Sequence, residues 1–88
     1  MIKTKEKEIR ELLKVSEQAR KAFDKMLMYY QLYDKFNYTS HVKLLKSIYL
    51  DTKRRFCWQL ENIANIGRST CFEYRKKYIK YFYICLSD

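Results

Sequence analysis

The chain contains no proline, and Gly67 is the only glycine among its 88 residues. Proline and glycine are the residues that most often interrupt helices. The chain also lacks alternating apolar and polar runs bounded by turn residues, which are typical of strands. The sequence therefore predicts an all-α fold, and its length is sufficient for one small domain at most.

Patterns typical of metal sites are absent from the sequence. The three cysteines, Cys57, Cys71 and Cys85, form no C-x-x-C pair, and His41 is the only histidine. A tetrahedral zinc site is therefore not expected, and we expect no other cofactor. An odd number of cysteines without a signal peptide favours a reducing, cytoplasmic location, with the thiols packed as small hydrophobic groups. His41 would open a helix, and we expect it on the surface.

Two further absences narrow the class of protein. No apolar run approaches the roughly twenty residues that a membrane-spanning helix needs, so no membrane partner is expected. The sequence also has no glycine-rich phosphate loop, no paired carboxylates in a cleft-like setting and no nucleophile next to a base. Enzymatic activity is therefore not expected.

Basic residues are abundant and unevenly distributed. The formal net charge is +9, from 19 Lys and Arg against 10 Asp and Glu, with a pI of about 9.5. Residues 53–80 hold eight basic side chains against Glu61 and Glu73, a net charge of +6, whereas residues 3–25 mix eight basic with five acidic side chains. This balance favours an anionic partner, most often nucleic acid, although a ribosomal or membrane surface would select the same sign.

The first third of the chain predicts one long helix, from about Thr4 to Phe36. Apolar residues recur there with the alternating spacing of three and four that is typical of a coiled-coil seam. Such a helix would be nearly 50 Å long, so we expect part of it to contact a second copy or another protein, and the rest of the domain to cover the remainder. Residues 1–38 are thus a predicted dimerisation or partner-binding helix. The seam consists of Ile9, Leu12, Ser16, Ala19, Phe23, Met26, Tyr30 and Tyr33.

Three shorter helices are predicted in residues 39–88. Ser40 is a suitable cap for a helix over 41–50, because its hydroxyl can accept a bond from a free helical N–H. A third helix is expected over 56–64, with Trp58 anchoring it in the core. A fourth is expected from Gly67 or Arg68 to about Leu86.

The segment between the third and fourth helices has the chemistry of a helix-turn-helix corner. Such a corner needs a residue that tolerates left-handed backbone, an apolar side chain in the turn and a small capping residue. Asn65 suits the left-handed conformation, Ile66 is the apolar residue, and Gly67 is acceptable as the N-cap. Arg68, Ser69 and Thr70 would then form the first turn of a recognition helix, the part that approaches DNA in this motif.

The outer face of that last helix supplies candidate DNA ligands. We take Cys71 as buried, so that the buried face continues through Tyr74, Tyr78, Tyr81 or Phe82, and Cys85. The opposite face could then read base edges, with Arg68 on guanine, Phe72 on a thymine methyl and Glu73 on cytosine. The remaining candidates are phosphate ligands, which position the protein without specifying sequence: Lys76, Lys77 and Lys80 on the helix, and Arg54 and Arg55 before the third helix.

The run "LENIANIGRSTCFEYRKKYIKYF", residues 60–82, resembles the C-terminal helix-turn-helix of small phage transcriptional regulators of the ArpU and RinA kind. Those proteins are similar to region 4 of bacterial sigma factors. Ile66, Gly67, Ser69 and Thr70 match the family's apolar turn residue, its cap and its paired Ser-Thr, and "YRKK" matches its basic tail. The resemblance implies a sequence-specific DNA-binding regulator of phage or prophage transcription that could contact RNA polymerase.

One alternative interpretation stays open at this stage. The N-terminal helix could be the functional part, in a helical interaction module or inhibitor of another protein. The basic helix would then supply only charge, with no DNA binding. Binding of single-stranded or structured RNA through tyrosines is a weaker alternative, because most tyrosines fall on the predicted buried face.

Overall fold

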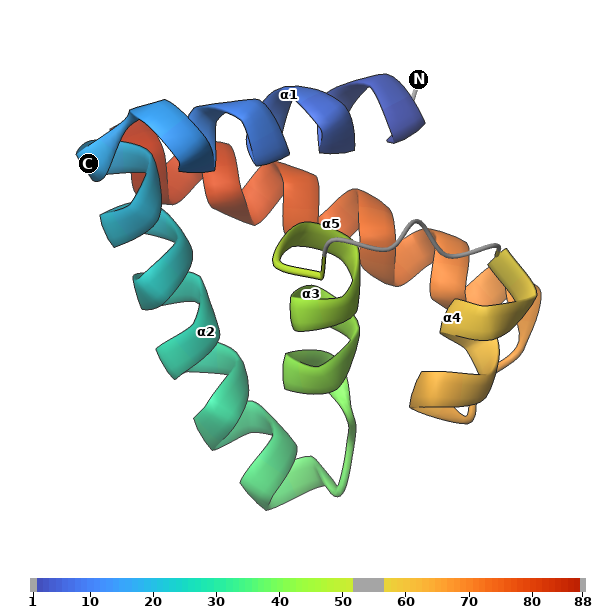
Figure 1. Cartoon of the computed structure of the whole chain (residues 1–88). Coiled ribbons are helices and arrows are strands. Elements are labelled where there is room, and N and C mark those ends of the chain that lie inside the picture. The colour runs from blue at the N-terminus through green and yellow to red at the C-terminus, as the bar shows by residue number, and fades with distance from the viewer. Residues whose placement is uncertain (1, 52–56, 88) are drawn as a thin grey trace.

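The structure is a computed structural model that describes residues 2–51 and 57–87 (Figure 1). Every element in these two stretches is a helix, which confirms the predicted all-α class. The fold has overall extents of 32 × 28 × 20 Å. In chain order the helices are α1 (Ile2–Val15), α2 (Glu17–Asn37), α3 (His41–Tyr49), α4 (Cys57–Ala64) and α5 (Arg68–Ser87).

The predicted single helix over 4–36 is wrong, because the chain breaks at Ser16. Ser16 has extended backbone angles, φ −119° and ψ 120°, and its hydroxyl accepts a bond from the N–H of Ala19. The guanidinium of Arg20 donates to the carbonyl oxygen of Leu13 at 3.0 Å, at the end of α1. Serine is a preferred N-cap, so the polar residue in the predicted seam starts a new helix.

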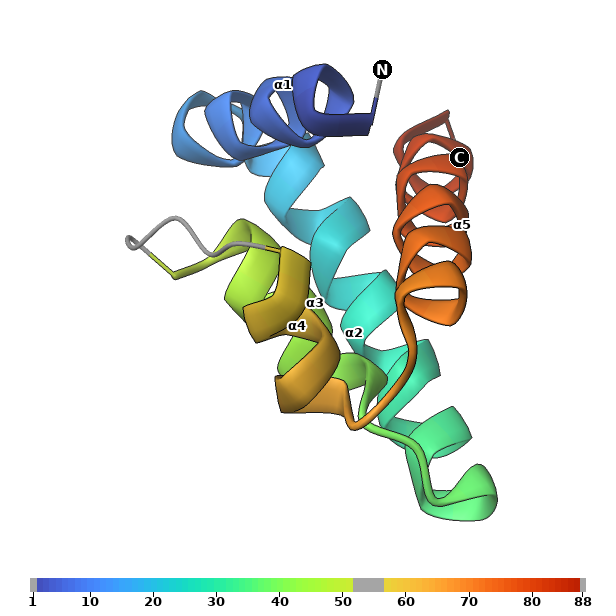
Figure 2. The same ribbon diagram turned by 90° about the vertical axis from the view of Figure 1, so that its right-hand side faces the viewer.

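The break allows α1 to fold back across α5 (Figures 1 and 2). A straight helix over 4–36 would be about 50 Å long, which exceeds the longest dimension of the fold. After the break, α2 also packs against α5 and carries more of the packing with that helix than any other element does. Helix α5 therefore packs with one face against α1 and α2, with α4 beside its first turns, and its other face is exposed.

The start of α3 is capped by α2 and not by Ser40, whose side chain makes no capping bond. The carboxylate of Asp34 accepts bonds from the N–H groups of His41 and Val42, each at 2.9 Å. It also accepts a bond from the hydroxyl of Thr39 at 2.5 Å. A carboxylate at a helix N-terminus satisfies free N–H groups and the helix dipole together, so Asp34 fixes the angle between α2 and α3.

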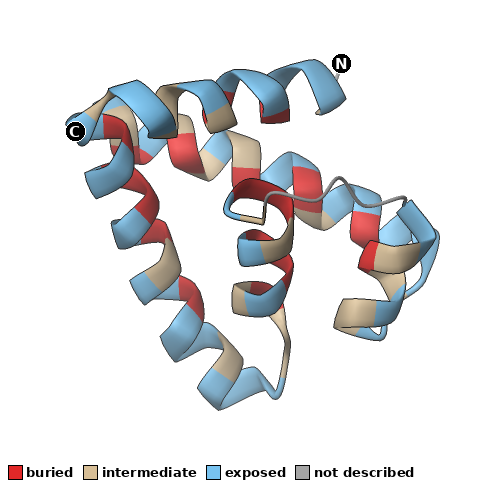
Figure 3. Ribbon diagram, viewed as in Figure 1, coloured by how far each residue is buried: buried red, intermediate tan, exposed pale blue. Residues whose placement is uncertain are grey.

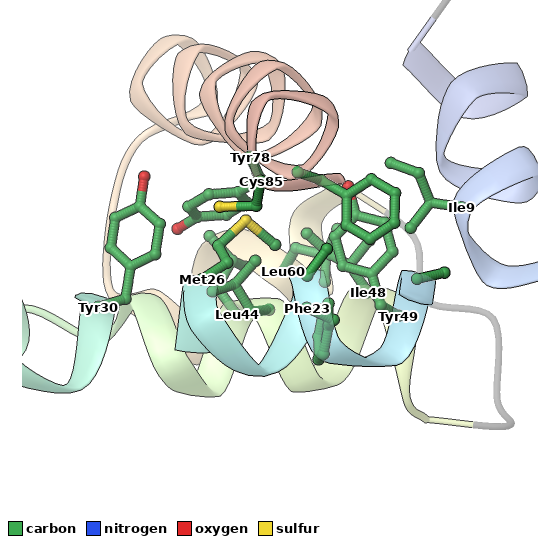
Figure 4. Close-up of a cluster of buried hydrophobic side chains, with 14 of the residues drawn as sticks. Ile9, Phe23, Met26, Tyr30, Leu44, Ile48, Tyr49, Leu60, Tyr78 and Cys85 are labelled. Atoms are coloured by element: carbon green, nitrogen blue, oxygen red, sulfur yellow. The ribbon is translucent and has the colours of Figure 1, made fainter. Parts of the chain in front are cut away.

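All five helices contribute to one hydrophobic core (Figure 4). The N-terminal seam is used inside the molecule, since Ile9, Ala19, Phe23, Met26 and Tyr30 are all buried there. Burial of this stripe against α3 and α5 removes its apolar surface from water without a second chain. The seam is therefore not available as a coiled-coil interface. The other buried apolar residues are Ala22, Leu44, Leu45, Ile48, Tyr49, Leu60, Cys71, Tyr78, Phe82 and Cys85.

Trp58 does not anchor α4, contrary to the prediction. Its side chain is 59% exposed, and Leu60 is the only residue of α4 that is fully buried. An eight-residue helix has little more than two turns, so it presents a single residue or two to the core. Leu60 occupies that place, and Trp58 points outward.

Candidate nucleic-acid interface

The corner between α4 and α5 has the geometry that its sequence predicts. Asn65 has a φ of 54°, in the left-handed region, and directly follows the end of α4. Ile66 is partly buried against the core. The carbonyl of Gly67 accepts the first bond of α5, from the N–H of Cys71 at 3.0 Å, so Gly67 is the residue that precedes the helix as expected.

Gly67 itself is not required by the backbone. Its φ is not positive, and a Cβ added at this position would have no neighbour within 4 Å. The left-handed turn of the corner is made by Asn65 instead. Glycine at 67 therefore leaves the entrance to α5 open and adds no side chain beside the first helical turn.

All of the predicted DNA-contacting residues on α5 are exposed (Figure 3). They carry four positive charges against one negative charge, a net of +3. The first-turn N–H groups of α5 have no acceptor within the helix, as at any helix start. A row of cations next to free N–H groups and a positive helix end attracts anions. The exposed residues are Arg68, Ser69, Thr70, Phe72, Glu73, Lys76, Lys77 and Lys80.

Lys76 contacts two of these side chains, Phe72 and Glu73, on one exposed patch. The Lys76 ammonium lies 4.8 Å from the centre of the Phe72 ring and 3.8 Å from a carboxylate oxygen of Glu73. Surface contacts of this kind contribute little to stability, so a ligand could rearrange them at small cost. Phe72 is 47% exposed, which leaves an aromatic surface available between the cations.

The opposite face of α5 is fixed by aromatic packing. Tyr78 is fully buried, its hydroxyl is hydrogen-bonded to His41 Nδ1, and its ring centre lies 5.2 Å from that of Tyr30. Burial raises the pKa of Tyr78 above its ordinary value and raises the pKa of Tyr30 to about 12. Both phenols therefore stay neutral at ordinary pH and hold α5 against α2 and α3.

His41 is buried, which corrects the prediction of a surface position. It lies among Tyr30, Tyr74 and Tyr78, and the closest ring centre is that of Tyr74, at 4.4 Å. Burial lowers the pKa of His41, the charge of Lys77 adds to that effect, and Asp34 opposes it. The imidazole therefore favours its neutral form directly behind the exposed face of α5.

Arg75 is the basic residue of this helix that the sequence interpretation did not separate from the others. It is buried and forms a bidentate ion pair with Glu6 of α1, at 2.7 and 2.9 Å. The pair raises the pKa of the guanidinium above its ordinary value, mainly through the hydrogen bond to Glu6. One of the eight charges counted over residues 53–80 is thus neutralised inside the fold. The helical spacing 71-75-78-82-85 is the signal in the sequence that could have placed Arg75 on the buried face.

Cys57 differs from the other two cysteines. Cys71 and Cys85 are buried, as predicted, and burial raises the pKa of the Cys71 thiol. Cys57 is exposed, and its sulfur accepts a bond of 3.5 Å from Arg75. Among residues 2–51 and 57–87, no cluster of His, Cys, Asp and Glu is suited to a metal ion.

Two predicted phosphate ligands, Arg54 and Arg55, lie outside the residues that the structure describes.

Behind the corner there is a pocket of about 240 Å³. Its walls include Tyr38, His41, Asn65 and Tyr74, so it separates the start of α3 from the corner.

None of the five described helices is long and apolar enough to cross a membrane.

No protein-family model, curated protein or solved structure matches the chain. The interpretation of the exposed face of α5 therefore rests on the residues and their geometry.

Proposed function

We propose that the protein is a DNA-binding transcriptional regulator in which α4, the corner at 65–67 and α5 form a helix-turn-helix. The single observation that carries the proposal is the combination of a left-handed Asn65 with an entirely exposed basic face at the start of α5. In this motif the first turns of the second helix enter the major groove. The resemblance of residues 60–82 to phage regulators supports a role in phage or prophage transcription, and RNA polymerase is the further partner that it implies. The odd number of cysteines supports a cytoplasmic location.

The roles of the exposed side chains follow from their chemistry. Arg68, at the first position of α5, can donate two bonds to one guanine, which is the commonest base-specific contact. Phe72 can cover a thymine methyl group, and Glu73 can accept from cytosine. Lys76, Lys77 and Lys80 continue along the same helix and fit phosphates, which set register but not sequence.

The test is a fluorescence polarisation assay on AT-rich duplex DNA, over a series of salt concentrations and with a site first obtained by selection. Three phosphate contacts would give a slope of about −3 in a plot of log affinity against log salt concentration. We expect Arg68→Ala to weaken specific binding by about 1–3 kcal/mol, and Lys77→Ala to weaken binding less and equally on all sequences. Lys14→Ala is the matched control, since Lys14 is an exposed lysine on α1 that is paired with Glu11 at 3.6 Å. Absence of duplex binding at low salt would refute the proposal.

The alternative, an interaction module that acts through the N-terminal helix, makes a different prediction. Its seam is covered by α3 and α5, so a partner would need another face of α1 or α2. Reversing the charges of Lys76 and Lys77 should abolish DNA binding under our proposal. Under the alternative, the double variant would bind its protein partner as the parent does, and neither form would bind DNA.

A further inference from the structure

The pocket behind the corner lies where two helices end. Ala64, the last residue of α4, and Tyr38, which directly follows the last residue of α2, both line it. Within residues 2–51 and 57–87, Tyr38 and Asn65 are the only residues with a positive φ, 54° in each, and Asn65 lines the pocket as well. Left-handed backbone is unfavourable for a tyrosine, and such positions concentrate at ligand sites. This coincidence makes the pocket a candidate ligand site.

The walls of the pocket suit an uncharged, flat ligand. None of the nine described residues that line it is Asp, Glu, Lys or Arg, although these make up 33% of the chain. An ion bound there would have no counter-ion on the walls, which is unfavourable in a partly enclosed site. The rings of Tyr38, His41 and Tyr74 favour contact with another aromatic ring. A cavity of about 150 Å³ already holds benzene, so a ligand of two fused rings fits in about 240 Å³.

Three polar side chains on the walls have hydrogen-bonding capacity to spare. In the part of the chain that the structure describes, neither the hydroxyl of Ser40 nor the amide of Asn65 makes a hydrogen bond. His41 uses Nδ1 for Tyr78, which leaves Nε2. The hydroxyl of Tyr49 is the only buried side-chain polar atom without a partner in that same part of the chain, so water reaches Nε2, and the pocket is its route. An amide and a neutral imidazole together offer both donors and acceptors.

We propose that this pocket binds a neutral purine ring, with the hydrogen-bonding edge of the base against the amide of Asn65. An asparagine amide matches adenine, since it can donate to N7 and accept from the N6 amine. Tyr38 is 96% exposed and borders the open side of the pocket, so its ring is free to cover the base. A bound purine would contact α3, the corner and α5 together. It would therefore hold the helix-turn-helix in place against α3.

A purine can reach this pocket from two sources. One is a free nucleoside, which would act as an effector of the protein. The other is an unpaired base of bound DNA, because Asn65 lies just before Arg68, the first residue proposed to approach a base edge. The second source rests on the proposed function, whereas the first does not.

The experiment is a titration of the isotope-labelled full chain with adenosine, followed by NMR. A ring system of roughly ten heavy atoms, at the usual efficiency of small ligands, gives a Kd on the order of 1 mM. Saturable shifts are expected in the amide signals of residues 38–41, 64–66 and 74. Thymidine, with a single ring, should bind roughly three-fold more weakly or worse, because it makes fewer contacts. Absence of a saturable shift up to about 10 mM adenosine would overturn the proposal, and so would shifts confined to the exposed face of α5 around Phe72.

Two variants remove ligand contacts while keeping the backbone. Tyr38→Asn removes the ring, and asparagine tolerates the left-handed conformation better than tyrosine, so the urea midpoint should not fall. Asn65→Gly removes the amide at a position where glycine adopts a φ of 54° freely. Each should weaken adenosine binding by roughly five-fold or more. The matched control is Phe36→Asn, at an exposed aromatic position in the last turn of α2 outside the pocket, and it should bind as the parent does. Binding at the parent's affinity by both Tyr38→Asn and Asn65→Gly would overturn the proposal.

A polarisation assay with two duplexes that differ only by one unpaired adenine separates the two sources. If a base of bound DNA is the ligand, the unpaired adenine should raise the affinity of the parent roughly three-fold or more, and Tyr38→Asn should lose that gain. If the ligand is a free nucleoside, the two duplexes should bind equally while adenosine still shifts the pocket signals. The adenosine titration contains no DNA, so a failure of duplex binding would refute the proposed function and leave the pocket proposal standing on its own result.

Discussion

The buried ion pair between Glu6 and Arg75 gives the sharpest test of the fold. In Arg75→Met the guanidinium is lost, and the carboxylate of Glu6, whose side chain is 4% exposed, stays in the core without its partner. Removing one member of a buried pair costs about 3–5 kcal/mol. The total stability expected for a chain of this length is only about 4–13 kcal/mol, so the variant should be severely destabilised.

The measurement is urea unfolding followed by circular dichroism, together with thermal unfolding. A loss of 3 kcal/mol should lower the Tm by at least about 12 °C, since 1 kcal/mol corresponds to roughly 4–8 °C in a domain of this size. The double variant Glu6→Leu/Arg75→Met should recover much of the loss, because neither charge is then buried. Arg75 stays charged throughout the accessible pH range, since its pKa is raised and its contribution would be lost only above that value.

Lys14→Met is the control for this prediction. Lys14 also belongs to an ion pair, but its side chain is 69% exposed, and such pairs contribute little. If Arg75→Met lost less than 1 kcal/mol, or no more than Lys14→Met, the reasoning that links burial to the cost of an unpaired charge would be refuted for this site.

Two further predictions concern the corner and the buried histidine. Asn65→Ala should destabilise the fold by about 1 kcal/mol, because alanine disfavours a φ of 54°. Gly67→Ser should stabilise the fold slightly, because serine adds a capping hydroxyl and has room at this position. Urea unfolding of both variants measures these changes, and equal stabilities of the two variants would contradict the prediction. His41 is the only histidine, and its pKa is lowered in the fold, so the unfolded chain takes up its proton first as the pH falls below about 6.5. Stability should therefore drop between pH 7.5 and 5.5, and the drop should be smaller in His41→Gln; parallel urea midpoints at the two pH values would disprove it.

Local signals in the sequence were sufficient for the corner and for the last helix. Asn65 acts through the conformation of its own backbone, so no distant residue is needed to interpret it. The buried spacing of Cys71, Tyr78, Phe82 and Cys85 also follows from the period of a helix. For these reasons α5 begins and ends within a residue of its prediction.

The features that were missed depend on contacts that are distant in sequence. The 3-4 spacing around Ser16 fits a continuous helix as well as two helices, and the choice depends on whether α1 can pack on α5. The burial of Arg75 depends on Glu6, which lies 69 residues away. His41 is buried because four tyrosines from α2 and α5 surround it, and no local pattern encodes that arrangement.

The contact between Glu6 and Arg75 also bears on where the chain could be shortened. A fragment that starts after residue 38 would keep α3, α4 and α5 but would lose the carboxylate that neutralises Arg75. It would also expose the faces of Leu44, Tyr78 and Phe82 that the first two helices cover. The candidate DNA-reading half is therefore not autonomous, because the first fifteen residues supply the counter-ion that keeps its central helix inside the protein.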